Sequence, residues 1–187
     1  MLLNQWDGSN DFASFGVSIA DAGDLNDDGL PDIVVGSSGA TVGAQTFVGS
    51  VYTYTFNSYL IPSMRSVSAS AGGTINFDLT FPDAAGLDEY KILISETGIG
   101  PTTYGVDIPL TQDSLVIDTF FGNYPVPGIS AMHGTLDASG DGTASLTVPA
   151  GIPAGLVGRT YYFAAIANQA GQLPEYSSAA FALEITL

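Results

Sequence analysis

Apolar residues recur at every second position in several short runs of this chain. In residues 73–81, GTINFDLTF, every other side chain from Ile75 to Phe81 is apolar, and in a strand such side chains lie on one face. Similar runs rich in β-branched and aromatic residues are typical of strands. They are GSVYTYTF (49–56), EYKILISE (89–96), SLVIDTFF (114–121), GTASLTV (142–148), RTYYFAAIA (159–167) and AAFALEITL (179–187). The pattern predicts an all-β protein.

The segments between these runs are rich in glycine and proline, of which the chain has 23 and 10. They are PDAAGLD, GIGPTTYG, NYPVPG, DASGDG, PAGIPAG and NQAGQLPE. Many short strands separated by such turns indicate antiparallel structure. Only Ile152–Val157 could form a helix, and Pro153 and Gly155 limit it to about one turn.

The composition of the chain changes near Asn57–Ser63. The part before this segment is acidic and contains no Lys or Arg, and the first basic residue is Arg65. Most of the strand-like runs follow it. We therefore predict a first domain at residues 1–60 and a second at residues 61–187, the second an antiparallel, immunoglobulin-like β-sandwich. At about 125 residues, such a domain can bury well over half of the surface of its unfolded chain.

The charge of the chain limits its partners. Three Lys and Arg residues stand against 19 Asp and Glu residues, which gives a formal net charge of −16. Such a chain has no basic patch to neutralise phosphate, which argues against nucleic acids and anionic membranes as partners and favours cations as ligands. No apolar stretch is long enough to span a membrane. There is no cysteine, which excludes disulfides and thiolate chemistry.

The most acidic segment is DLNDDGLPD, residues 24–32. It places side-chain oxygens at alternate positions, followed by a glycine that permits a sharp turn, a main-chain carbonyl and a closing carboxylate. Ca²⁺ prefers six to eight such oxygen ligands. We predict one Ca²⁺ bound by the side chains of Asp24, Asn26, Asp28 and Asp32 and by the carbonyl of Leu30.

The loop differs from an EF-hand, because Val35 stands where the glutamate of loop position twelve is expected. Its flanks, FGVSIA and DIVVG, also look like strands and not like helices. Asp and Gly are common in turns for local reasons, so a surface turn that binds no metal remains the alternative.

Residues 15–56 resemble an FG-GAP repeat of the integrin-type β-propeller. Phe15-Gly16 matches the FG element, Asp24–Asp32 the calcium loop and Gly49–Tyr54 the closing strand. Val35–Ser38 stands where the family often has a VGAP-like run, with Ser-Ser in place of Ala-Pro. The resemblance implies a four-stranded blade, an extracellular location and a structural Ca²⁺. A full propeller needs several blades, and this chain has one recognisable copy.

Residues 66–187 resemble the β-sandwich that ends many secreted bacterial FG-GAP proteins. The stretch that carries this resemblance is MHGTLDASGDGTASLTVPAGIPAGLVGRTYYFAAIANQAG, residues 132–171. That resemblance implies no activity. The chain begins with MLLNQW, which lacks the basic start and the apolar region of a signal peptide. We interpret the protein as secreted or attached to the cell surface, with its leader or a larger N-terminal part outside this sequence.

Other candidate sites are weaker. DASGDG, Asp137–Gly142, has alternating oxygens but no closing acid, and we expect a hairpin turn there, although a second ion is left open. His133 is the only histidine, and no GxSxG element accompanies it, so a nucleophilic triad has no support. Nothing in the sequence brings together a pair of acids for glycoside cleavage. The candidates for such a pair are Glu89, Glu96, Glu175 and Glu184. We expect no enzymatic activity.

We therefore expect an extracellular, calcium-binding structural or adhesive protein. The strand expected at Leu2–Trp6 has no preceding blade in this chain, so it needs another edge to pair with. That edge is either Val51–Phe56 of its own chain or the same edge of a neighbouring copy. We expect the strand to promote self-association, with filaments as one outcome. A surface protein or a glycan is a further candidate partner. The alternative is a non-catalytic carbohydrate-binding module of a larger secreted hydrolase, in which Trp6 would contact sugar.

Overall fold

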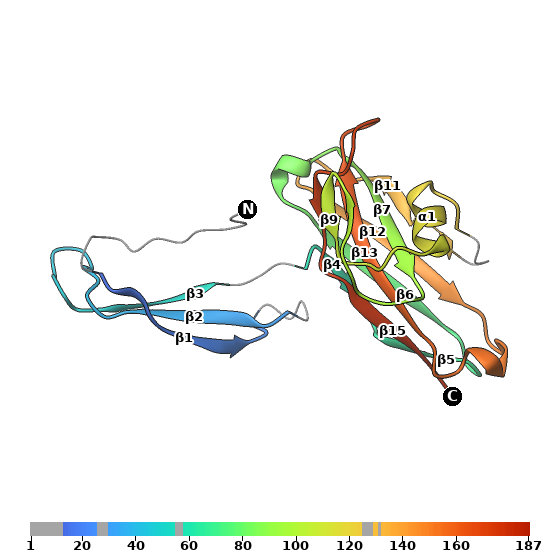
Figure 1. Ribbon diagram of the computed structural model, residues 1–187, viewed down its shortest axis with the longest axis horizontal. Helices are drawn as coiled ribbons and strands as arrows, with labels where there is room; N and C mark the ends of the chain where they lie inside the picture. Colours follow the sequence, from blue (N-terminus) through green and yellow to red (C-terminus); the bar gives the residue numbers. More distant parts are fainter. Residues whose placement is uncertain (1–12, 26–29, 55–57, 125–128, 131) are drawn as a thin grey trace. The chain divides into compact units, whose positions relative to one another are not determined.

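The computed structural model describes residues 13–25, 30–54, 58–124, 129–130 and 132–187. The chain divides into two compact units, Met1–Asn57 and Ser58–Leu187, and each is described by itself below (Figure 1). Strands dominate both units, and the described residues contain one short α-helix and two turns of 3-10 helix. The prediction of an all-β protein is confirmed.

The first unit contains a three-stranded antiparallel sheet in the order β1 (Phe15–Gly23), β2 (Asp32–Ser37) and β3 (Ser50–Tyr54). Its register places Ile19 opposite Val35 and Val35 opposite Tyr52. These are three of the four strands expected for a blade. The strand that we predicted at Leu2–Trp6 lies outside the described residues.

The second unit contains two larger sheets. The first has the order β10 (Ile129–Ser130), β12 (Asp141–Val148), β6 (Gly73–Thr80) and β4 (Leu60–Pro62). The second has the order β11 (His133–Thr135), β7 (Glu89–Ser95), β13 (Thr160–Asn168), β15 (Phe181–Thr186) and β5 (Ser66–Ser68), with β14 (Tyr176–Ser177) beside β13. Pairing within them is antiparallel except between β15 and β5. Strands β8 (Thr102–Tyr104) and β9 (Val106–Ile108) form a small antiparallel hairpin.

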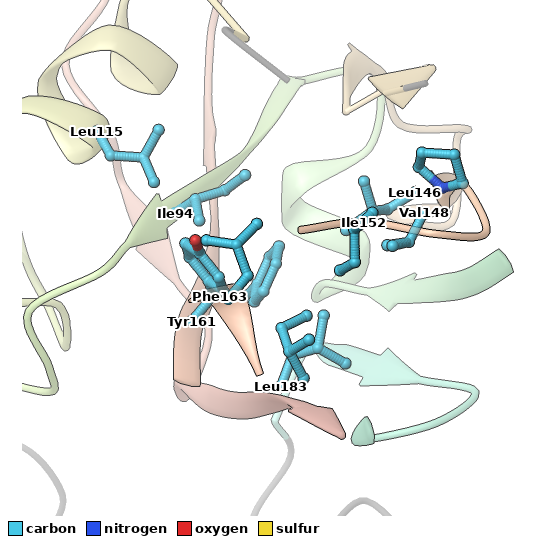
Figure 2. A pocket seen from close by; sticks show the side chains of 11 residues that line it. Ile94, Leu115, Leu146, Val148, Ile152, Tyr161, Phe163 and Leu183 are labelled. Atoms are coloured by element: carbon cyan, nitrogen blue, oxygen red, sulfur yellow. The ribbon is translucent and has the colours of Figure 1, made fainter. Parts of the chain in front are cut away.

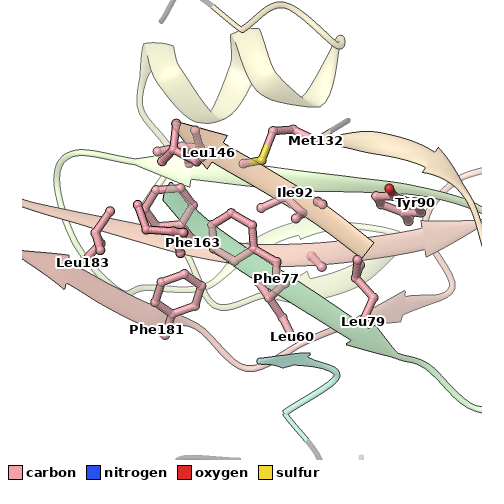
Figure 3. Close-up of a cluster of buried hydrophobic side chains, with 14 of the residues drawn as sticks. Leu60, Phe77, Leu79, Tyr90, Ile92, Met132, Leu146, Phe163, Phe181 and Leu183 are labelled. Carbon is pink, nitrogen blue, oxygen red and sulfur yellow. The ribbon is translucent and has the colours of Figure 1, made fainter. Parts of the chain in front are cut away.

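One apolar core lies between these two sheets (Figure 3). Strand β6 alternates buried and exposed positions, and its buried residues Ile75, Phe77 and Leu79 face this core. The ring of Phe77 lies 5.9 Å from that of Phe163 on β13 and 5.8 Å from that of Phe181 on β15. Aromatic pairs at this spacing add favourable edge and face contacts to the area that they bury.

Strands β7 and β13 are buried on both faces, which explains their nearly continuous apolar sequences. On the face away from the main core, Leu93 and Ile166 belong to a second cluster. Helix α1 (Ser114–Phe120) contributes Val116 to this cluster, and strand β9 contributes Ile108.

The prediction of a strand at SLVIDTFF is wrong, because these residues form α1. Asp113 caps the helix by accepting a hydrogen bond from the Val116 N–H at 2.8 Å, which satisfies one of the N–H groups that a helix leaves unpaired at its start. Val116 and Thr119 lie three positions apart and are both buried. Capping and burial of one helical face therefore outweigh the strand preference of Val116 and Ile117.

Two of the predicted turns also need correction. GIGPTTYG contains β8, so part of it is strand. DASGDG is a turn as predicted, but it joins β11 and β12, which pair with β7 and β6 in different sheets and do not form a hairpin. The helical turn expected within Ile152–Val157 is a 3-10 turn at Ala154–Leu156, and a second one at Asp83–Ala85 lies in PDAAGLD.

Candidate metal centre

The hairpin of β1 and β2 brings the two ends of the acidic loop together. Gly23, the last residue of β1, pairs with Asp32, the first residue of β2. Asp24 follows directly in the sequence, so the first and last predicted ligands both lie at the base of the loop. The register of the β1–β2 hairpin therefore places an acidic residue at each end of the loop.

Asp32 is fully buried, with 0% of its surface exposed. Its Oδ2 accepts a hydrogen bond from the Leu25 N–H at 2.6 Å, which joins the start of the loop to its end. A carboxylate removed from water requires compensation by hydrogen bonds, a cation or a metal ion. The chain contains no Lys or Arg before Arg65, so the first unit offers no basic side chain for this purpose. A bound cation fits this environment.

Glycine is needed where β1 enters the loop. Gly23 has a φ of +70°, a conformation that costs other residues about 1 kcal/mol or more. Its N–H donates to the Asp21 Oδ1 at 2.7 Å, and the pairing of β1 with β2 shifts between Asp21 and Gly23. This bulge turns the chain toward Asp24 and is of the kind that often redirects side chains at functional sites.

Two of the five predicted ligands, Asn26 and Asp28, lie outside the described residues. Of the others, Asp24 is exposed and Leu30 is half-buried. Within the described ranges, no group of three or more His, Cys, Asp or Glu residues could hold a metal ion. A site at this loop therefore depends on Asn26 and Asp28 in addition to the base formed by Asp24 and Asp32, and it remains a prediction.

The FG element has a defined structural role. The ring of Phe15 contacts those of Tyr52 and Tyr54 edge to face, with centroids 5.6 and 6.2 Å apart. Gly16 has a φ of +81° and begins a bulge that extends to Ser18. The glycine thus lets the chain bend directly after the phenylalanine while the ring packs on β3.

Ser37 has a structural role that was not predicted from the sequence. Its side chain is buried, and its hydroxyl donates to the Ala13 carbonyl at 2.7 Å. The Gly39 N–H donates to the same carbonyl at 2.9 Å. These bonds fasten the chain before β1 to the end of β2. The replacement of Ala-Pro by Ser-Ser in the VGAP-like run was the available signal, because a hydroxyl can bond a carbonyl that alanine cannot.

The other candidates lie apart from this loop in the sequence and have ordinary surroundings. His133 is exposed, and its ring stacks on that of Tyr124 with centroids 5.8 Å apart. The four glutamates Glu89, Glu96, Glu175 and Glu184 are all exposed. In DASGDG, the Asp137 Oδ1 accepts from the N–H groups of Ser139 and Asp141 at 2.8 and 3.0 Å, so this carboxylate stabilises the turn.

Comparison with known proteins supports the FG-GAP resemblance of the β1–β3 segment. The family profile of the FG-GAP repeat matches residues 15–54, which run from the start of β1 to the end of β3. The chain thus contains one FG-GAP repeat, the unit of integrin-like β-propellers and typical of extracellular proteins. Neither the curated proteins nor the solved structures gave a match. In the described part of the chain, every helix is too short or too polar to cross a membrane.

Proposed function

We propose that this protein is an extracellular, calcium-binding protein with a structural or adhesive role and no catalytic activity. The observation that carries the proposal is the buried Asp32 at the base of an acidic loop, in an FG-GAP repeat that has no basic residue. The family resemblance supports the location and the role, and the chemistry of the loop supports the ion.

Several residues of the loop would coordinate Ca²⁺ together. Asp24, Asn26 and Asp28 would supply side-chain oxygens, Leu30 its carbonyl, and Asp32 the closing carboxylate. The ion would offset the charge of the acids, including Asp27, which adds to the negative field without a predicted bond. Ligand binding to the folded state alone stabilises it by about 2.7 kcal/mol at a free concentration a hundred times the Kd.

Substitution of Asp32 by asparagine tests the site. The asparagine side chain retains an oxygen for the Leu25 N–H but removes one negative charge. In excess chelator, Asp32→Asn should melt at or above the temperature of the wild type, because repulsion within the loop is weaker. In calcium, it should melt below the wild type, because a ligand is lost. Differential scanning fluorimetry in both conditions measures the melting temperatures of the variant and the wild type and shows whether their order reverses.

Asp118→Asn is the matched control, since Asp118 is an exposed residue of α1, and it should keep the full response to calcium. Asp28→Asn should behave as Asp32→Asn does. A wild-type melting temperature that is the same in calcium and in chelator would refute the site.

The exposed surface of the first unit supports self-association. Ile19 on β1 is 65% exposed and Val51 on β3 is 72% exposed. Ile19 pairs with Val35 of β2, and Val51 pairs with the next residue of β2, Gly36. Paired residues lie on the same face of a sheet and successive residues of a strand lie on opposite faces, so Ile19 and Val51 are on opposite faces. A sheet with apolar groups on both faces suits stacking between two neighbours, as in a propeller, and such stacking between copies continues unless it closes into a ring.

Light scattering of the intact chain in calcium tests the assembly. We expect concentration-dependent growth that Ile19→Lys and Val51→Lys each reduce, because a charge on either face opposes stacking. Leu173→Lys is the control, because Leu173 is a similarly exposed leucine of the second unit. Removal of Met1–Asp7 should also reduce growth if the predicted strand takes part. A chain that stays monomeric at high concentration, or lysine variants that assemble like the control, would refute stacking through this sheet.

A further inference from the structure

The second unit contains an apolar cavity of about 270 Å³ at one end of its core (Figure 2). Its buried floor comes from both sheets, with Leu146 on β12 and Ile94, Phe163, Leu183 and Ile185 on the other sheet. Protein interiors are packed as densely as organic crystals, and voids larger than a water molecule are few. This space is not an enclosed void of that kind, because it opens to solvent at its rim.

The rim of the cavity is partly exposed, so a molecule can enter from solvent. Leu115 of α1, Val148 of β12 and Leu156 of the 3-10 turn are half-buried there. Among the lining side chains, which are otherwise aliphatic, proline or phenylalanine, the Tyr161 hydroxyl is the single polar group. Walls of this kind do not hold water, which needs two or more polar partners.

The chemistry of the walls disfavours an inserted polypeptide backbone as the occupant. Each residue of an inserted segment would bring a backbone N–H and C=O that need hydrogen-bond partners, and these walls provide almost none. A hydrocarbon chain has no such requirement. A cavity of about 150 Å³ with similar walls takes one benzene molecule, of six carbons, so a cavity of 270 Å³ has room for about ten carbons.

The charges beside the rim favour an uncharged head group. A neighbouring hollow shares Tyr161 with the cavity and is also lined by Glu96 and Arg159, one acid and one base. An anionic head would be attracted by Arg159 but repelled by Glu96, and a cationic head the reverse, so neither gains a net advantage from this hollow. The net charge of −16 further disfavours an anion. We infer that the cavity binds the hydrocarbon chain, of about ten carbons, of a lipid with an uncharged head, which remains at the rim near Tyr161.

Methyl NMR of the full chain during titration with 1-decanol tests the inference. We expect saturable shifts of the methyl groups of Ile94, Leu146 and Leu183, and none at the exposed Leu173. The matched probe is 1,10-decanediol, which has the same length but must bury a second hydroxyl without a partner. It should bind at least about tenfold more weakly.

Two variants fill the cavity. Leu183→Phe adds volume at the floor and Leu156→Phe at the rim, where the structure tolerates it better, and each folded variant should lose decanol binding. Leu173→Phe makes the same change at an exposed position and should retain it. The inference is overturned if decanol causes no saturable shifts, if the diol binds as tightly as decanol, or if folded Leu156→Phe binds decanol normally. It is also overturned if the methyl groups of the cavity shift with protein concentration alone, because a second copy would then occupy the cavity.

Discussion

At the scale of single residues, the surroundings of an acidic side chain decide what it does in this protein. Asp32 and Asp113 are both aspartates at the edge of a regular element, yet their surroundings differ. Asp32 begins a strand and is fully buried, whereas Asp113 precedes a helix and is half-buried among donors. The ligand spacing of residues 24–32 identified Asp32 as a candidate. Its burial and its bond with the Leu25 N–H were not predictable, because both depend on the register of the β1–β2 hairpin.

Asp113 joins helix α1 to the end of strand β7. Its Oδ1 accepts from the Val116 N–H, and its Oδ2 accepts from the Ser95 hydroxyl, the Glu96 N–H and the Thr97 hydroxyl at 2.8–3.0 Å. Partial burial acts to raise the pKa of Asp113, but these four hydrogen bonds outweigh it and hold the pKa below its usual value of 3.8. They stabilise the charged form of the carboxyl group.

This lowered pKa makes part of the stability depend on pH. A carboxyl whose pKa is lower in the folded state contributes stability above its unfolded pKa, and this is lost as pH falls through the folded pKa. Asp113→Asn should therefore cost about 2 kcal/mol at pH 7, and the difference from wild type should shrink as the pH falls below 3.8. Urea unfolding at pH 7 and pH 3 measures it. Asp118→Asn on the same helix should show no such loss, and a cost for Asp113→Asn that is equal at both pH values would contradict the prediction.

At the scale of elements, strands were predictable where the alternation of apolar and polar residues along the sequence alone defines them. The alternation in β6 follows from the geometry of an extended chain, and the structure has β6 at Gly73–Thr80, within the predicted run. Helix α1 was not predictable by alternation, because Leu115–Ile117 resembles a strand, although Asp113 before it was a usable capping signal. The assignment of β11 and β12 to different sheets could not be predicted, since it depends on contacts between distant parts of the chain.

The turn at DASGDG gives a prediction at this scale. Gly140 has a φ of +83°, and a Cβ there would lie 2.5 Å from the Phe81 carbonyl oxygen and 2.6 Å from that of Pro82. Both are backbone atoms, so neither can move aside as a side chain would. Gly140→Ala should therefore destabilise the protein by about 2 kcal/mol or more, measured by urea unfolding.

Gly155→Ala is its control, because the added methyl group has no neighbour within 4 Å and φ is not positive. Calcium should leave the cost of Gly140→Ala unchanged, since the Asp137 carboxylate holds the turn by hydrogen bonds. A cost that disappears in calcium would instead indicate an ion at Asp137–Gly142.

At the scale of the whole molecule, the two units differ in how they are stabilised. The core of the second unit includes the large side chains of Phe77, Phe163 and Ile92, all at most 2% exposed. In the described part of the first unit, the buried apolar residues are Ala13, Val35 and Ala40. A unit of that size seldom gains enough stability from its core alone and usually needs a metal ion or a partner. This contrast agrees with the proposed dependence of the first unit on calcium and on neighbouring copies.

The contrast predicts two separate thermal transitions in the intact chain, because units with independent cores need not unfold together. Calcium at a hundred times its Kd should raise the lower transition by about 10–20 °C, since about 2.7 kcal/mol acts on a unit of some 60 residues. The upper transition, from the second unit, should not move. Differential scanning calorimetry of dilute protein in calcium and in chelator measures both, and Asp32→Asn should abolish the shift of the lower one. A single transition, or two that respond equally to calcium, would show that the ion does not act on the first unit alone.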